Sequence, residues 1–490
     1  MQDAGISELN RLRKDLSLLE TKYGASVRRS DSAEHELSAA EETIARLREK
    51  LRAAERKRDE ADHYKSLFHQ LRSRWYLRPF IPQSMLFSPK ADAEDCWKFR
   101  GPRFAPPVPD QGGHHPRPRV LIVGHVLSSM LFGGEHSLLD TIFAVDPERF
   151  DLFAVFPEKN ERVFTEIQGH VQGIAVLDYG WWRVGRPAPE ETVAAFSELY
   201  RRHAIDLVHV NTIMLRDPLI AARRAGIPAI THARELISCD HTLAARLGGS
   251  AAEILGDLCE HASHILANSA ATLADYPCPE KGSFLYNSVD AAAFDFPNSV
   301  DPARIHVGLI SSNIAKKGIA DFVQLAQTAK ETLPQLQFHL IGPETDFTRQ
   351  LEASVLPGNF HVHGYEPHPA DAYRGLNIVL NLSHFAESFG RTIAESMAAR
   401  RPVIAYRYGA LPELIDDGQT GFLVPHLDSN AVLEKLAFFA AHPEQITEFG
   451  EEARRRVTDR FSREKLRQGI TALYDRLLSD AKRIGDSTHV

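Results

Sequence analysis

Glu387-Ser388-Phe389-Gly390-Arg391-Thr392-Ile393-Ala394-Glu395 is the stretch that says most about the fold of this chain. An apolar run at 378–382 precedes it and an alanine-rich stretch follows it, a pattern that predicts a strand, a tight loop and the start of a helix. The first turn of a helix offers unpaired backbone N–H groups and the positive end of the helix dipole, which together favour a diphosphate. Glu387 falls in the loop and Glu395 in the second helical turn, so each carboxylate could hold sugar hydroxyls, one on each side of the phosphates. The stretch therefore predicts a site for a nucleotide-sugar.

Length and composition limit the classes of protein to consider. The 490 residues are too many for one hydrophobic core and predict two or three domains. A hydrophobic content of 43% and a charged content of 25% are ordinary for a globular protein, and the net charge of -8 argues against nucleic acid as a partner. The N-terminus lacks the basic and apolar regions of a secretory signal, and no run approaches about 18 apolar residues. We therefore expect a cytoplasmic protein without a membrane span.

The cysteines and histidines show no metal-binding pattern. The four cysteines are scattered and include no Cys-x-x-Cys pair: Cys96, Cys239, Cys259 and Cys278. We expect them to be reduced thiols and not a disulfide framework or a zinc site. His361 and His363 alternate along a predicted strand, but none of the 23 histidines falls at ligand spacing from Cys or Asp. No metal site is predicted.

Residues 1–78 differ from the rest and predict an α-helical coiled coil. Apolar residues recur there in steps of three and four, as in the seam of a coiled coil: Leu9, Leu12, Leu16, Leu19, Tyr23, Leu37, Ala40, Ile44, Leu47, Leu51, Ala54 and Ala61. Gly24 weakens the middle of the pattern. A parallel coil would make the protein a homo-oligomer, whereas an antiparallel hairpin or a single solvated helix would not.

Residues 65–80 mix basic and aromatic side chains, among them Arg72, Arg74, Trp75 and Tyr76. Such a segment can contact anionic lipid headgroups, which would place the protein at the inner face of a membrane, or it can pack the coil onto the next domain. Residues 79–118 are rich in proline and glycine and are predicted to form a linker.

From Arg119 onward strands and helices alternate. Short apolar runs predict strands at 120–124, 152–156, 174–177, 207–210, 229–231 and 265–267 and, after a break at 295–298, at 306–310, 338–341, 360–362, 378–382 and 402–405. Such alternation implies parallel, doubly wound sheets. We predict an α/β fold with two Rossmann-like domains, 119–298 and 299–460, and a helix within 461–490 that packs back on them. Ligands bind at the carboxyl ends of parallel strands, so the cleft between the domains is the predicted site.

Several short motifs follow one another on this background. Besides the two glutamates at 387 and 395 they are Gly133-Gly134-Glu135, the strand end at 206–211, His232-Ala233-Arg234-Glu235, the turn at 286–290, Lys316-Lys317-Gly318, His363-Gly364-Tyr365 and Gly409-Ala410-Leu411-Pro412-Glu413. Over residues 119–478 the chain resembles the retaining glycosyltransferases of family 4, which have the GT-B fold. The resemblance implies a hexosyltransferase-like, metal-independent enzyme whose nucleotide-sugar is its donor substrate, with no further cofactor.

One position departs from the family pattern and bears on phosphate binding. Where the family usually has an arginine this chain has Ser312, so either Lys316 or Arg391 supplies the second positive charge or turnover is reduced. Lys317 is the candidate for the first, as a point charge in a loop after a strand. The backbone N–H groups of Gly390, Arg391 and Thr392, with the adjoining Ser388 and Phe389, would add the contribution of the helix N-terminus.

The resemblance assigns the remaining donor-binding roles. It implies that Glu387 contacts the donor sugar near its anomeric carbon and that Glu395 accepts hydrogen bonds from the ribose hydroxyls. His232 is predicted to follow a strand, to face the cleft and to contact the donor sugar or its phosphate; the alternative is a histidine with local hydrogen bonds only. Gly133 and Gly134 are predicted to form a turn before a helix at 136–145, where the backbone can approach the donor closely.

We therefore expect a glycosyltransferase that moves a sugar to a glycan, lipid-linked or protein acceptor. Two alternatives stay open: a nucleotide-sugar epimerase on the same fold, and a coiled-coil scaffold protein with a degenerate transferase domain. Ser312 favours the scaffold, whereas the presence of both Glu387 and Glu395 speaks against it.

Overall fold

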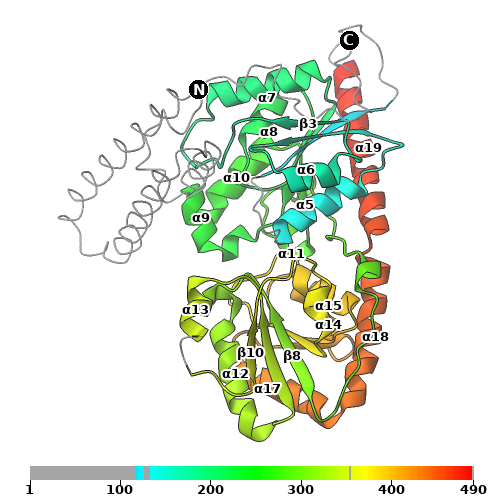
Figure 1. The fold of residues 1–490 in the computed structure, drawn as a ribbon. Helices are drawn as coiled ribbons and strands as arrows, with labels where there is room; N and C mark the ends of the chain where they lie inside the picture. Colours follow the sequence, from blue (N-terminus) through cyan, green and yellow to red (C-terminus); the bar gives the residue numbers. More distant parts are fainter. Residues whose placement is uncertain (1–116, 126–132, 353–354, 488–490) are drawn as a thin grey trace, which may run out of the picture. The chain divides into compact units, whose positions relative to one another are not determined.

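The computed structural model describes residues 117–125, 133–352 and 355–487 (Figure 1). The chain divides into two compact units, Met1–Ala91 and Asp92–Val490, and all the described residues belong to the second unit. The predicted coiled coil, the segment at 65–80 and the linker up to residue 116 lie outside the described residues.

The first sheet has seven strands in the order β3-β2-β1-β4-β5-β6-β7, and every pair of neighbours is parallel. The strands are β1 (Arg119–Val123), β2 (Asp151–Phe156), β3 (Gly173–Val176), β4 (Leu207–Val210), β5 (Ala229–Ala233), β6 (His264–Ala267) and β7 (Gly282–Phe284). The helices of this part are α5 (Gly133–Ala144), α6 (Glu161–Ile167), α7 (Glu190–Arg202), α8 (Asp217–Arg224), α9 (His241–Leu247), α10 (Ala251–His261) and α11 (Ala270–Leu273), with 3-10 turns η4 (Ile237–Cys239), η5 (Pro279–Lys281) and η6 (Ala291–Phe294).

The second sheet has six strands, again all parallel, in the order β10-β9-β8-β11-β12-β13. They are β8 (Ile305–Ile310), β9 (Leu336–Ile341), β10 (Phe360–His363), β11 (Ile378–Asn381), β12 (Val403–Tyr406) and β13 (Gly421–Val424). The helices are α12 (Ile319–Thr332), α13 (Asp346–Glu352), α14 (Asp371–Arg374), α15 (Arg391–Ala398), α16 (Leu411–Leu414), α17 (Ser429–Ala441), α18 (Pro443–Arg460) and α19 (Arg463–Ser487), with a 3-10 turn η7 (Ala315–Lys317). The two parallel Rossmann-like sheets confirm the predicted α/β fold.

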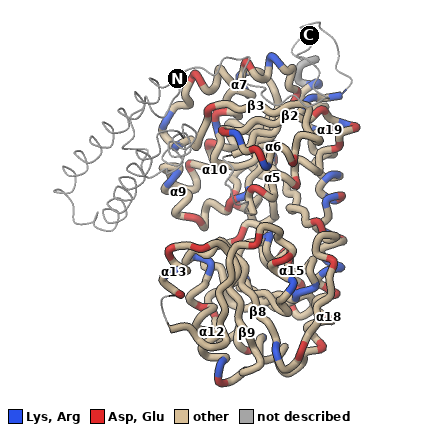
Figure 2. Tube along the Cα trace, in the orientation of Figure 1, with Lys and Arg blue, Asp and Glu red and all other residues tan. Residues whose placement is uncertain are grey.

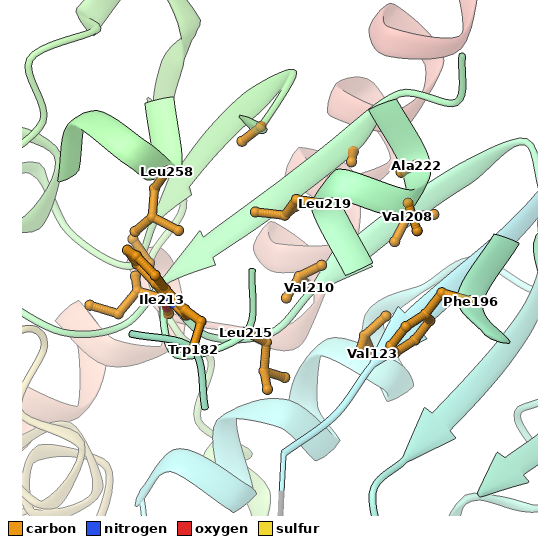
Figure 3. Close-up of a cluster of buried hydrophobic side chains, with 14 of the residues drawn as sticks. Val123, Trp182, Phe196, Val208, Val210, Ile213, Leu215, Leu219, Ala222 and Leu258 are labelled. Carbon is orange, nitrogen blue, oxygen red and sulfur yellow. The ribbon is translucent and has the colours of Figure 1, made fainter. Parts of the chain in front are cut away.

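Apart from the edge strand β7, the strands of the first sheet are largely buried on both faces. In β1, Leu121 and Val123 contact one apolar layer and Val120 and Ile122 contact the other, because successive side chains of a strand point to opposite faces. Figure 3 shows side chains of β1, β4, α7 and α8 in the first of these layers: Val123, Phe196, Val208, Val210, Leu219 and Ala222. Continuous apolar runs of this kind are what parallel strands covered on both faces require.

Helix α19 packs on the first sheet although it follows the second sheet in the chain. Its apolar side chains join the layer of Val120 and Ile122 at a spacing of three and four residues: Leu466, Ile470, Leu473, Tyr474 and Leu477. Acidic and basic side chains mix along α18 and α19, whereas α10 carries Glu253, Asp257 and Glu260 without a Lys or Arg (Figure 2). Among these helices none combines the length and the apolar character that crossing a membrane requires.

Three local expectations differ from the structure. Helix α5 already begins at Gly133, so the two glycines belong to its first turn and not to a turn that precedes it. The short strands β7 and β13 were not predicted, because three or four residues beside a glycine give too little periodicity to distinguish a strand from a loop.

The prediction of reduced thiols is wrong for two of the four cysteines. Cys259 on α10 and Cys278 before η5 form a disulfide, with their Cα atoms 6.1 Å apart. Packing of α10 beside the chain that leads into β7 brings them together, and their separation of 19 residues carries no sequence signal of such a contact. Cys239 is a free thiol.

Candidate functional site

A cavity of about 270 Å³ lies at the carboxyl ends of β8, β9 and β11 and is bounded on its other side by α5. The loop after β8 contributes Ser312, and the loop after β11 contributes Ser383 and Glu387. Helix α15 lines it with Arg391, Thr392 and Glu395, and α5 lines it with Gly133 and His136. The carboxyl edge of a parallel sheet is where ligands bind in such folds.

Lys317 and Glu387 face one another in this cavity. The Nζ atom of Lys317 lies 2.8 Å from Oε1 of Glu387, and the hydroxyl of Ser383 donates a hydrogen bond of 2.8 Å to the same oxygen. Burial alone would raise the pKa of Glu387, but the charge of Lys317 and the hydrogen bonds from Lys317, Ser383 and Asn381 outweigh it and lower this pKa. Glu387 is therefore an ionised carboxylate at neutral pH.

Glycines place this pair. Gly318 follows Lys317 with φ of +74°, and a Cβ atom there would lie 2.0 Å from the carbonyl oxygen of Leu382, so no other residue allows this approach of the lysine loop to the end of β11. Gly409 has φ of +59°, and a Cβ atom there would lie 2.4 Å from the carbonyl oxygen of Glu387. The Lys-Gly motif and the glycine at 409 thus both position the loop after β11 that carries Glu387, called the acidic loop below.

Arg391 and Glu395 form a second charged group on α15. The Nε atom of Arg391 donates a hydrogen bond of 2.8 Å to Oε1 of Glu395, and the hydroxyl of Tyr373 donates one of 3.0 Å to Oε2. Burial raises the pKa of Glu395, although Arg391 and Tyr373 oppose this. The arginine also reaches α5, where its Nη1 atom lies 2.6 Å from Oδ2 of Asp140.

The start of α15 depends on Gly390, its N-cap residue. Gly390 has φ of +91°, and a Cβ atom there would meet Leu411 at 2.5 Å. Arg391 and Thr392, the first two helical residues, line the cavity, so the N-terminus of α15 opens onto it.

Ser388 and Phe389 do not line this cavity. The hydroxyl of Ser388 donates to the carbonyl oxygen of Arg234 at 2.6 Å and accepts from Nδ2 of Asn268 at 3.0 Å, so it joins the two sheets' domains. Phe389 is buried and packs against the rings of Tyr286 and Phe461.

His232 lies within β5 and is buried, whereas we expected it after the strand and facing the cleft. Its Nδ1 atom lies 3.0 Å from Nε2 of His209 and 3.2 Å from Nη2 of Arg234. His209 in turn places Nδ1 at 2.7 Å from the hydroxyl of Tyr474. His232 does not line the cavity, and the hydrogen-bonded row of two histidines and a tyrosine was not predicted.

The partners of this row determine where its protons lie. Arginine can only donate, so Nδ1 of His232 accepts, and its proton is on Nε2. His209 then donates from Nε2 and accepts from Tyr474. Burial first and Arg234 second lower the pKa of His232 well below its usual value and that of His209 to about 3, so both rings are neutral at pH 7. The Nε2 atom of His232 has no hydrogen-bond partner among the described residues.

The structure adds cavity residues that the motifs did not indicate. His136 on α5 is one of them; burial and then Arg391 lower its pKa to about 4, so it is neutral. Gly133 lines the cavity and Gly134, next to it, does not. Tyr373 belongs to none of the sequence motifs. It reaches Glu395 because α14, which carries it, lies beside α15.

The histidines of the second sheet bind one another. His306 Nδ1 lies 2.8 Å from His339 Nε2, and His339 Nδ1 lies 2.9 Å from His363 Nε2. Within residues 117–125, 133–352 and 355–487 no group of three or more His, Cys, Asp or Glu side chains is placed to hold a metal ion.

Comparison with known proteins identifies the second sheet and its helices. Residues 298–456 match the family described as Glycosyl transferases group 1. Trehalose synthase of Pyrococcus horikoshii is 32% identical over 177 residues, which cover 33% of this chain and 41% of that protein. A lipopolysaccharide core biosynthesis mannosyltransferase of Rhizobium leguminosarum bv. viciae is 30% identical over 41% of this chain and 63% of its own length. This chain thus spans less than two thirds of the length of either relative.

Solved structures extend the likeness to both sheets. The Anabaena protein HepE in complex with UDP-glucose superposes with a TM-score of 0.60 at 20% identity, covering 73% of this chain and 99% of that one. This likeness shows the fold, and the family match supports the resemblance to glycosyltransferases over residues 298–456. Residues 298–456 therefore form a group 1 glycosyltransferase domain, and the two sheets together have the GT-B fold.

Proposed function

We propose that this protein is a retaining glycosyltransferase that moves a sugar from a nucleoside-diphosphate sugar to a glycan, lipid-linked or protein acceptor. The observation that carries the proposal is the Lys317–Glu387 pair, which lies beside the N-terminus of α15 in a cavity at the carboxyl ends of parallel strands. The family match of residues 298–456 and the likeness to a fold that holds UDP-glucose in HepE support it.

The charges of the cavity suit the bond that breaks. As the anomeric carbon separates from the diphosphate, the leaving group gains negative charge and the sugar ring gains positive charge. Lys317 and the first-turn N–H groups of α15 stabilise the diphosphate. The ionised carboxylate of Glu387 holds the donor sugar and stabilises its positive charge. Glu395 accepts hydrogen bonds from the ribose.

Retention follows if the acceptor attacks from the face on which the diphosphate leaves. The acceptor oxygen then forms its bond to the anomeric carbon while the bond to the phosphate oxygen breaks, and a phosphate oxygen takes the acceptor proton. Because Lys317 and the helix N-terminus supply positive charge, this step is proposed to need no divalent metal. Self-association through residues 1–78, membrane contact through 65–80 and a cytoplasmic location stay predictions.

Thermal unfolding with UDP, GDP and ADP tests the donor site, followed by hydrolysis of the matching sugar nucleotide. At least one nucleoside diphosphate should raise the melting temperature. Glu387→Gln, which keeps the shape and removes the charge, should slow hydrolysis by about 100-fold. Glu434→Gln makes the same change at an exposed position of α17 and should hydrolyse at the wild-type rate.

Other results would contradict the proposal. If none of the three diphosphates changes the melting temperature, the cavity is not a donor site. The alternative of a coiled-coil scaffold protein with a degenerate transferase domain is then favoured. If the sugar nucleotide becomes an epimer without an acceptor and without release of free diphosphate, the protein is an epimerase. If Glu387→Gln hydrolyses as fast as Glu434→Gln, the acidic loop has no part in the reaction.

A further inference from the structure

The cavity contains few positive charges for a ligand that carries several negative ones. Among the described residues that line it, the lysine and arginine side chains are those of Lys317 and Arg391, and Ser312 is uncharged. Lys317 already pairs with Glu387. We propose that the Arg391 guanidinium is a second diphosphate-binding group, that it replaces a cation at position 312, and that Asp140 is the counter-ion with which the diphosphate competes.

The hydrogen bonds of Arg391 leave part of its guanidinium available. Its Nε atom binds Glu395 and its Nη1 atom binds Asp140. Its Nη2 atom makes no hydrogen bond to any described residue, and the side chain is 15% exposed. An arginine has five N–H donors in a planar fork that matches two oxygens of a phosphate. Arg391 can therefore bind phosphate without leaving Glu395.

The surroundings keep Arg391 charged and in place. Burial alone would lower its pKa, but the carboxylates of Asp140 and Glu395 outweigh burial and raise this pKa above its usual value. Gly133 lies beside the arginine side chain: a Cβ atom at this glycine would lie 3.9 Å from Cβ and Cδ of Arg391. Asp140 and Gly133 both belong to α5, so the guanidinium is held between α5 and α15 on the wall of the cavity.

Asp140 acts as a competitor for the same group. Its carboxylate contacts Arg391 at 2.6 Å and is 10% exposed, so its negative charge is poorly screened by water. A diphosphate that binds Arg391 must share the guanidinium with this carboxylate. Removing the charge at position 140 should therefore strengthen diphosphate binding, while removing the charge at position 391 should weaken it.

Lys316, the other candidate to replace a cation at position 312, is placed elsewhere. Its Nζ atom lies 3.2 Å from Oδ2 of Asp240, its side chain is 42% exposed, and it does not line the cavity. It also lies over the ring of Phe385, at 4.2 Å from the centroid. Lys317 lies over the same ring at 4.4 Å, so the pairing with Asp240 and the absence from the cavity lining are what set Lys316 apart.

Calorimetric titration with UDP, GDP and ADP, their parent nucleosides and inorganic pyrophosphate tests this proposal, which rests on the proposed donor site. Arg391→Gln should weaken nucleoside diphosphate and pyrophosphate binding by about tenfold or more and weaken nucleoside binding by less, since Arg391 also holds Glu395. Asp140→Asn should strengthen diphosphate binding. Ser312→Arg added to Arg391→Gln should restore it, which a purely structural role of Arg391 would not produce.

The outcomes separate this proposal from the donor site itself. If wild-type protein binds none of the diphosphates, the donor site fails. Suppose that wild-type protein binds one of the diphosphates. If Arg391→Gln binds it with equal affinity, or loses as much affinity for the nucleoside as for the diphosphate, Arg391 is not a phosphate-binding group. If Ser312→Arg does not restore binding, the two positions are not equivalent. Should Arg391→Gln fail to fold, Arg391→Lys keeps the charge without the fork and should bind diphosphate with intermediate affinity.

Discussion

The hydroxyl of Tyr474 on α19 lies 2.7 Å from Nδ1 of His209 on β4, across 265 residues of sequence. Both side chains are fully buried, and the bond ties the last helix of the chain to the centre of the first sheet. His209 also contacts His232, whose Nδ1 atom accepts from Arg234, so His209 carries its proton on Nε2 and its Nδ1 atom accepts from the hydroxyl at 474. A helix that follows the second sheet in the chain thus completes a row of buried hydrogen bonds within the first sheet.

Tyr474→Phe should lower the free energy of unfolding by about 1–3 kcal/mol, because it leaves a buried ring nitrogen without its donor. Urea denaturation measures this change. In a His209→Leu background the same substitution should have a smaller effect, since no acceptor remains. Equal effects in the two backgrounds would show that the tyrosine contributes through its ring packing and not through this bond.

The stability of the protein should fall as the pH decreases below neutral. His209 has a pKa of about 3 in the folded protein, below its ordinary value of about 6.5, so its contribution is complete above pH 6.5 and is lost as the pH falls toward 3. The loss from this one group approaches about 1.4 kcal/mol per pH unit. Urea unfolding at pH 7, 6 and 5 should show a shallower dependence for His209→Leu than for wild type. Parallel curves would mean that His209 does not titrate on unfolding.

Gly409→Ala should damage both stability and activity. The added Cβ would lie 2.4 Å from the carbonyl oxygen and 2.8 Å from the nitrogen of Glu387, at a φ of +59° that alanine disfavours. The backbone of the acidic loop has to shift, so we expect the unfolding free energy to fall by about 1–3 kcal/mol and sugar-nucleotide hydrolysis to fall with it.

Gly256→Ala is the matched control and should change stability in the opposite direction. Gly256 lies in the middle of α10, and an added Cβ meets nothing within 4 Å. Alanine is the better helix former by about 0.5–1 kcal/mol, so the variant should unfold at higher urea concentration with unchanged hydrolysis. A loss of stability here would mean that α10 does not tolerate a methyl group at this face.

Replacing both cysteines of the disulfide, as Cys259→Ser with Cys278→Ser, should lower the unfolding free energy by about 3 kcal/mol. The bridge closes a loop of 19 residues and so restricts the unfolded chain. In dithiothreitol the unfolding free energy of the wild-type protein should fall toward that of the double variant. Dithiothreitol should not change the unfolding free energy of the double variant itself. If wild-type protein has the same unfolding free energy with and without dithiothreitol, and that value equals the value of the double variant, the bridge is not formed.

The local features of the fold followed from neighbouring residues. Alternating apolar runs and helical stretches predicted two parallel sheets, because the period of the side chains and the turn residues act over a few positions. The strand, loop and helix around Glu387 and Glu395 were visible for the same reason, and Gly318 marked the loop of Lys317. The strands β7 and β13 were not predicted, because three or four residues are too few to show a strand periodicity.

By itself, then, the amino-acid order determined the fold class and indicated the candidate residues for a diphosphate site, since steric preference, periodicity and charge are properties of short segments. Tertiary structure alone decided that Arg391 meets Asp140 and that Tyr474 meets His209. It also buried His232 and joined Cys259 to Cys278. Such contacts depend on how whole helices and sheets pack, and no local rule relates the partners that this packing selects.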